Sequence, residues 1–172
     1  LQNQGRDLIG AVKTLQRAGL EVMGGFIVGF DTDKADIFKR QFEFIQRSGV
    51  VTAMVGLLTA LPQTRLYQRL KREGRIETET TGNNTQAALN FKPKLNREYL
   101  VNGYRELMRQ LYEPRTYYRR IRNFLQDYHP RGGPGRLSWS DCEAFVKSFW
   151  LLGLWHRGRT AYWRFFWSTL QL

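Results

Sequence analysis

The fold is decided by residues 21–30, which read Glu-Val-Met-Gly-Gly-Phe-Ile-Val-Gly-Phe. A nearly continuous apolar run of this length is typical of a parallel strand that is buried on both faces. Its glycines would weaken an isolated strand, so we expect another group to approach the backbone closely here. That group is either a ligand or a packed helix.

The segments around this run alternate between helix and strand patterns. Residues 6–18 have apolar side chains at helical spacing and are followed by Gly19, which predicts an amphipathic helix with a glycine cap. Residues 31–48 begin with capping residues and continue the helical spacing, and residues 50–58 form a second strand-like stretch. This order, with short connections, predicts βα units around a parallel sheet.

The second half of the chain has a different character. After Leu61 no strand pattern appears; residues 66–74 predict a short helix and residues 76–95 a long loop. Residues 96–172 predict only helices. We therefore predict an α/β fold, in which a βα part covering residues 1–75 is joined by the loop to an all-helical domain.

The composition is that of a globular and strongly basic chain. Its 172 residues include 27 Lys and Arg against 15 Asp and Glu, a net charge of +12. Twenty of the basic and nine of the acidic side chains lie in residues 61–172. A field of this sign attracts nucleic acid, anionic lipid or a phosphorylated ligand.

The cysteine content and the first residues limit the class of protein further. The single cysteine, Cys142, excludes an internal disulfide and any site that needs two thiolates from this chain. No run of about 18 uncharged apolar residues occurs, so we expect no transmembrane helix. The first residues lack a starting Met and a signal peptide, so we expect a piece of a longer, cytoplasmic protein.

Two segments at the predicted carboxyl ends of strands are candidates for chemistry. Residues 24–31 place glycine at both ends of a strand, where backbone can approach a planar ligand. In residues 59–67, Pro62 fixes a turn, Thr64 can cap the next helix, and freed backbone groups could hydrogen-bond a purine. The alternative is that the glycines only ease helix packing and that the second segment is an ordinary strand-to-helix turn.

Together these segments resemble the fifth and sixth strands of radical S-adenosylmethionine enzymes. In that superfamily the first of these strands reads Gly-x-Ile-x-Gly, here residues 25–29. The later strand commonly ends in Pro-Gly-Thr-x-Leu-Tyr, here residues 62–67 with Gln63 in the usual glycine position. Asp31 stands in place of a more distant Glu of many relatives.

Further motifs are similar to one subgroup of that superfamily, which carries a cobalamin-binding domain, the radical barrel and a helical tail domain of unknown function (DUF4070). These motifs are Gly82-Asn83-Asn84-Thr85, Leu89-Asn90-Phe91-Lys92-Pro93, Gly103-Tyr104, Tyr112-Glu113-Pro114 and Arg159-x-x-Tyr162-Trp163. The resemblance implies that residues 1–75 are the closing part of a partial (β/α) barrel and residues 96–172 the tail domain.

The resemblance also implies cofactors and an activity. The cofactors are S-adenosylmethionine, a [4Fe–4S] cluster and cobalamin, and the activity is methyl transfer to a lipid-like or other hydrophobic substrate. The family's cluster needs three cysteine thiolates, and this chain has only Cys142. We therefore expect the cluster ligands and the cobalamin domain upstream of Leu1, and no activity from the isolated chain.

The resemblance assigns site residues on the wall of the S-adenosylmethionine pocket. The assigned cofactor contacts are Gly25, Ile27 and Gly29 against the adenosyl group, and the backbone of Ala60, Leu61 and Pro62 around adenine. Asn83, Asn84 and Asn90 are candidates for substrate contact, because amides supply donors and acceptors; the alternative is a structural turn.

We expect no catalytic residue and no metal ligand in this chain. His129 and His156 have no metal-ligand spacing. Cys142 follows Asp141 on a predicted helix, which favours a small buried residue over a nucleophile.

Arginines and aromatic residues interleave within residues 115–122 and 155–167. The aromatics can form a core with arginines solvated outside, or lie at a membrane surface with arginines toward anionic lipid. Binding of single-stranded nucleic acid ranks last, because no standard nucleic-acid module is visible. The alternative to an enzyme is thus a basic helical module that binds anionic membrane or nucleic acid without catalysis.

Overall fold

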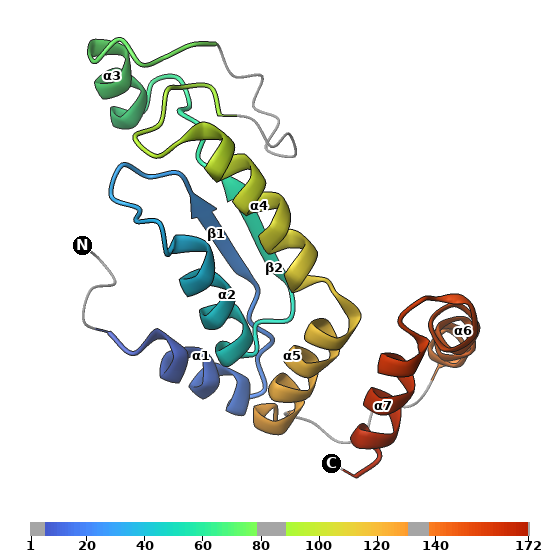
Figure 1. Cartoon of the computed structure of the whole chain (residues 1–172). Helices are drawn as coiled ribbons and strands as arrows, with labels where there is room; N and C mark the ends of the chain where they lie inside the picture. Colours follow the sequence, from blue (N-terminus) through green and yellow to red (C-terminus); the bar gives the residue numbers. More distant parts are fainter. Residues whose placement is uncertain (1–5, 79–88, 131–137, 172) are drawn as a thin grey trace. The chain divides into compact units, whose positions relative to one another are not determined.

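The computed structural model describes residues 6–78, 89–130 and 138–171 (Figure 1). In chain order the elements are α1 (Leu8–Arg17), β1 (Gly24–Val28), α2 (Ile37–Ser48), β2 (Ala53–Leu57), α3 (Arg65–Arg72), α4 (Arg97–Leu111), α5 (Pro114–Asp127), α6 (Trp139–Ser148), the π-helix η1 (Phe149–Trp155) and α7 (Arg159–Thr169). The predicted α/β class is confirmed as a small parallel sheet combined with helices.

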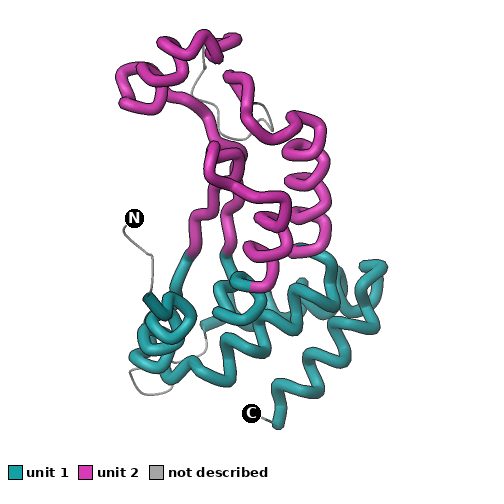
Figure 2. Tube along the Cα trace, turned by 60° about the vertical axis from the view of Figure 1, so that its left-hand side comes forward, with its two compact units in different colours: residues 1–23, 44–52, 112–172 teal, residues 24–43, 53–111 magenta. Residues whose placement is uncertain are grey.

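The chain divides into two compact units that interleave along the sequence (Figure 2). One unit comprises residues 24–43 and 53–111, with both strands, α3, α4 and the first part of α2. The other comprises residues 1–23, 44–52 and 112–172, with α1, the end of α2 and the C-terminal helices. The predicted boundaries between a βα part, a loop and a helical domain stay a prediction.

The two strands pair in parallel, in the register that sets Gly24 opposite Ala53. One face of the pair is covered, with Val28 and Ala53 fully buried. On the other face Ile27 is 50% and Met54 61% exposed. The prediction of a strand buried on both faces is therefore wrong. Side chains point alternately to the two faces of a strand. Within the described residues, other elements of the unit pack against only one of these faces.

A cluster of buried apolar side chains fixes the end of β2 against the segments that follow it. Its members are Leu58, Ala60, Leu70, Leu89, Phe91 and Leu100. Ile76 and Phe91 also form an isolated antiparallel bridge, so the segment predicted as a loop contains a short pairing. This cluster holds the carboxyl edge of the sheet in place.

Local signals for helix ends are confirmed. Gly19 and Gly49 follow α1 and α2 with φ of 82° and 70°, the left-handed conformation that glycine adopts without a steric penalty. Thr64 caps α3, its Oγ1 accepting from the Tyr67 backbone N–H at 3.1 Å. These short-range features are the part of the fold that the sequence encodes most directly.

Replacing Gly103 with alanine should destabilise the fold. A Cβ there would lie 2.2 Å from Cε2 of Phe38, so the ring must move. Overpacking of this kind costs about 1–3 kcal/mol, against a gain of about 1 kcal/mol in helix propensity. We expect Gly103→Ala to lower the Tm measured by circular dichroism.

The matched control is Gly56→Ala, because a Cβ at Gly56 would meet nothing within 4 Å. An equal loss of Tm in both variants would contradict the role given to the Phe38 contact.

Candidate functional site

The candidate site is the open face of the β1–β2 pair, where the backbone lies bare at two positions. Gly25 pairs with Met54, and Ile27 pairs with Gly56. A Cβ at Gly25 or at Gly56 would meet nothing within 4 Å. The two glycines thus alternate with two exposed apolar side chains, a surface on which a flat ligand can lie directly against the backbone.

The carboxyl end of β1 is shaped by Gly29, which is buried and has a φ of +110°. A Cβ at Gly29 would lie 3.4 Å from both Leu58 Cβ and Leu89 Cδ2. The Asp33 carboxylate accepts from the backbone N–H groups of Gly29 and Phe30 at 2.8 and 3.0 Å. Gly29 therefore forms the turn at the strand end, and its predicted contact with a cofactor stays a prediction.

Asp31 ties this turn to the segment after α3. Arg75 donates from Nη2 and Nη1 to the two oxygens of Asp31 at 2.7 and 2.9 Å, and Arg69 donates to Oδ2 at 3.1 Å. The hydrogen bond from Arg75 holds the pKa of Asp31 below its ordinary value. The carboxylate is therefore charged at neutral pH and occupied by two arginines.

Ala60 and Asn90 form two hydrogen bonds with each other after the end of β2. The Ala60 N–H donates to Asn90 Oδ1, and Asn90 Nδ2 donates to the Ala60 carbonyl, both at 2.9 Å. Both residues are buried. The contacts predicted for them, with adenine and with substrate, stay predictions; the structure shows a reciprocal pair that positions the following turn.

That turn presents two further predicted residues, Leu61 and Pro62, at the surface. Gln63 follows with a φ of 66°, the left-handed conformation that glycine adopts most readily. The Thr64 N–H donates to the Leu61 carbonyl at 3.3 Å and closes the turn. The turn therefore exposes two apolar residues, Leu61 and Pro62, followed by the polar Gln63 and Thr64.

Four of the predicted cofactor contacts are exposed: Gly25 and Ile27 on the open face of β1, and Leu61 and Pro62 in the turn after β2. The predicted substrate residues Asn83 and Asn84 lie outside the described residues.

Sequence reasoning missed Met54 and Gly56 as parts of the same face. The two-residue period of β2, set in register with β1, is the signal that could have identified them.

The structure also bears on Cys142, on metal ligands and on membrane-spanning helices. Cys142 is exposed, so the prediction of a small buried residue is wrong. Across residues 6–78, 89–130 and 138–171, no group of three or more His, Cys, Asp or Glu side chains is arranged to hold a metal ion. No helix within these ranges has the length and apolarity needed to cross a bilayer.

Comparisons with known proteins give a family and two relatives. The family described as "Domain of unknown function (DUF4070)" matches residues 64–172. An "Uncharacterized methyltransferase sll1242" of Synechocystis sp. is 39% identical over 127 residues, which cover 73% of this chain and 24% of the relative. The "Hopanoid C-2 methylase" of Rhodopseudomonas palustris is 27% identical over 167 residues, 92% of this chain and 31% of the relative. The chain thus spans about a quarter to a third of the relatives it matches, and no solved structure matches it significantly.

The contacts of Asp31 predict stability that is lost at acid pH. Its pKa is lowered in the folded state, so it stabilises the fold above its unfolded pKa and loses that contribution as pH falls through the folded value. Asp31→Asn should reduce the free energy of unfolding at neutral pH by about 1.5–3 kcal/mol, the range for hydrogen bonds to charged groups. The deficit should shrink below about pH 4, where the unfolded carboxyl is protonated.

Urea unfolding at neutral and acid pH measures this difference. Asp36→Asn, which changes an exposed carboxylate of the same unit, is the control and should have little effect at either pH. A deficit for Asp31→Asn that is independent of pH would contradict the electrostatic explanation.

Proposed function

The chain belongs to the DUF4070 family, and from this premise we propose that it is the C-terminal part of a methyltransferase of the radical S-adenosylmethionine type. Both relatives are named for methyl transfer, which supports an enzyme of the transferase class. In this proposal β1, β2 and their helices close a partial (β/α) barrel, and the later helices form the tail domain.

The observation that carries the proposal is the bare backbone at Gly25 and Gly56 on the open face of the sheet. Side chains on the inner face of a barrel strand point toward the enclosed ligand, and a glycine there leaves room for it. The flat nucleoside of S-adenosylmethionine would lie against this backbone, with Ile27 and Met54 at its edges. Leu61 and Pro62 would face its adenine.

The residues of this chain fit the nucleoside but not the cluster. Three thiolates are needed for the proposed [4Fe–4S] ligation, and the chain contains one cysteine. Residues outside this chain would hold the cluster and the cobalamin, and the isolated chain is proposed to be inactive. When bound, the cluster supplies electron transfer and cobalamin acts as a group carrier.

The proposed substrate is hydrophobic and lipid-like. The relative from Rhodopseudomonas palustris is named for methylation of a hopanoid. The open face offers apolar side chains at Ile27 and Met54, which suit a substrate with few polar groups. Asn83 and Asn84 remain the proposed source of polar substrate contacts, because the buried amide of Asn90 is already paired with the backbone of Ala60.

Filling the open face should block the cofactor without unfolding the protein. Gly25→Val and Gly56→Val each place a branched side chain into empty space on a strand, where valine is well tolerated. In the gene product that carries this chain, we expect each variant to weaken S-adenosylmethionine binding at least about tenfold, measured by equilibrium dialysis, with an unchanged Tm. Gly29→Val is a poorer probe, because its φ of +110° strains any side chain.

The control is Ala35→Val, a substitution at an exposed loop residue of the same unit. Unchanged affinity in both glycine variants would contradict the proposed pocket wall and favour the alternative, a basic helical module without catalysis.

A second proposal concerns the exposed apolar side chains of the C-terminal helices. Trp139 is 91% and Trp155 80% exposed. The other exposed apolar residues of α6, η1 and the α7 region are Phe145, Val146, Phe149, Trp150, Leu151, Leu152, Leu154, Trp167 and Leu170. Tryptophan favours the headgroup region and arginine favours anionic lipid. We propose peripheral contact with the cytoplasmic face of the inner membrane.

Removing two of these side chains should release the protein from vesicles. We expect the full chain to sediment with vesicles that contain phosphatidylglycerol, and Trp150→Ala/Trp155→Ala to reduce the bound fraction several-fold. Leu20→Ala/Met23→Ala removes exposed apolar groups far away in sequence and should retain binding. Absence of sedimentation, or an equal effect of the two double variants, would contradict membrane contact through these helices.

A further inference from the structure

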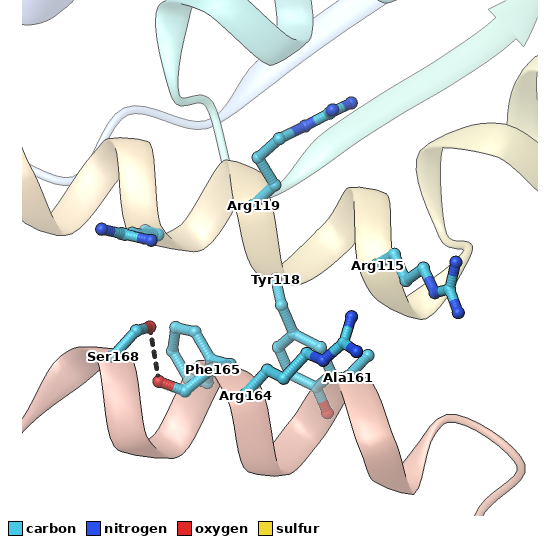
Figure 3. Close-up of a pocket in the computed structure, with 8 residues that line it drawn as sticks. Arg115, Tyr118, Arg119, Ala161, Arg164, Phe165 and Ser168 are labelled. Carbon is cyan, nitrogen blue, oxygen red and sulfur yellow. Dashed lines mark hydrogen bonds between the residues drawn. The ribbon is translucent and has the colours of Figure 1, made fainter.

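Helices α5 and α7 pack together within one unit and leave a groove of about 320 Å³ (Figure 3). The groove is lined by four arginines, Arg115, Arg119 and Arg122 from α5 and Arg164 from α7. The three on α5 are spaced i, i+4 and i+7, so they share one side of that helix. A groove of this kind concentrates positive charge at one place on the surface.

The floor of the groove is aromatic and fixed. The rings of Tyr118 and Phe165 stack with their centroids 5.0 Å apart and their planes inclined by 17°. Burial raises the pKa of Tyr118, so its hydroxyl stays neutral and adds no negative charge. An apolar floor also lowers the local dielectric, which strengthens the attraction between an anion and the rim.

The four arginines of the groove are all exposed. Within the ranges that the structure describes, none of them lies within ion-pairing distance of an acidic side chain. Glu113, the N-cap of α5, is an electrostatic neighbour of Arg115 without forming an ion pair. Among the described residues, therefore, no ion pair with a carboxylate neutralises the four guanidinium groups of the groove.

Figure 3 separates the roles of these side chains. Arg164 rises from α7 toward α5, and Arg115 lies at the same end of the groove, whereas Arg119 extends away from α7. Because Arg119 points away from α7, we assign ligand contact chiefly to the other three arginines that line the groove, Arg115, Arg122 and Arg164.

We infer that this groove binds a phosphate group. Guanidinium groups present planar, forked donors that match phosphate oxygens, and a phosphate has enough charge and acceptors to engage more than one of them. Bound phosphate would also relieve the repulsion among like charges on one helix face. The phosphate can be that of a lipid headgroup or of a free phosphorylated ion, and the inference does not depend on the proposed methyl transfer.

The test removes two of the charges and offers both sources of phosphate. The probes are inorganic pyrophosphate in calorimetry and phosphatidylglycerol vesicles in sedimentation, each with the full chain. Arg122→Gln/Arg164→Gln should weaken at least one of them about tenfold or more, with an unchanged Tm because both side chains are exposed. Loss confined to pyrophosphate identifies a free ion as the ligand, and loss confined to vesicles identifies a lipid headgroup.

The matched control is Arg40→Gln/Arg105→Gln, which removes the same charge from exposed positions on α2 and α4. Equal weakening by the two double variants, or no binding of either probe by the unchanged chain, would overturn the inference. A third result would also overturn the phosphate inference: no pyrophosphate binding, together with vesicle binding that Trp150→Ala/Trp155→Ala loses and Arg122→Gln/Arg164→Gln retains. That result would still support the proposed membrane contact. S-adenosylmethionine affinity should be the same in both arginine pairs, which separates this result from the proposed pocket.

Discussion

The parallel pairing of β1 with β2 is the constraint on which the rest of the sheet-containing unit depends. Because side chains alternate along a strand, one register decides both the core and the open face. It buries Val28 and Ala53 and leaves Gly25 and Gly56 bare on the other side. A shift of one residue in β1 would expose Val28 and bury Ile27. The register that buries the core side chains is therefore the same register that leaves the two glycines bare.

Polar contacts within the chain occupy several side chains at the carboxyl edge of the sheet. The carboxylates of Asp31 and Asp33 are occupied by arginines and by backbone N–H groups. The amide of Asn90 is occupied by the backbone of Ala60. These contacts fix the loops before any ligand arrives, which is the preorganisation that a binding site needs. The same contacts explain why ligand recognition here would rely on shape and backbone more than on charged side chains.

The sequence predicted the features that are governed by short-range chemistry. The helices and strands followed from apolar periodicity, and the helix ends followed from Gly19, Gly49 and Thr64. The sequence could not predict which face of the sheet would stay open, because coverage depends on elements that are distant along the chain. The pairing of Ala60 with Asn90 spans thirty residues and leaves no local pattern.

The basic residues of α5 show why residue type alone does not assign a role. Arg120 is fully buried, donates to the Val51 carbonyl at 3.2 Å and lies over the rings of Tyr112 and Tyr117. Burial lowers the pKa of Arg120, because desolvation disfavours its charged form. Its side chain nevertheless stays inside the unit, where it packs against the two rings. Arg119, its neighbour in sequence, is exposed. The alternative in which these arginines are solvated outside an aromatic core therefore does not hold for Arg120.

The charge surplus of the chain is concentrated rather than spread evenly. On α5 the carboxylates stand at the two ends: Glu113 caps the N-terminus, and Asp127 pairs with Lys13 and Arg17 at the C-terminus. Asp127 is unfavourable beside the negative end of the helix dipole, and its two cationic partners offset that cost. The exposed arginines between these ends have no carboxylate among the described residues at ion-pairing distance. The carboxylates at the two ends of α5 thus leave the exposed arginines of the α5–α7 groove as the charges that we propose an external anion neutralises.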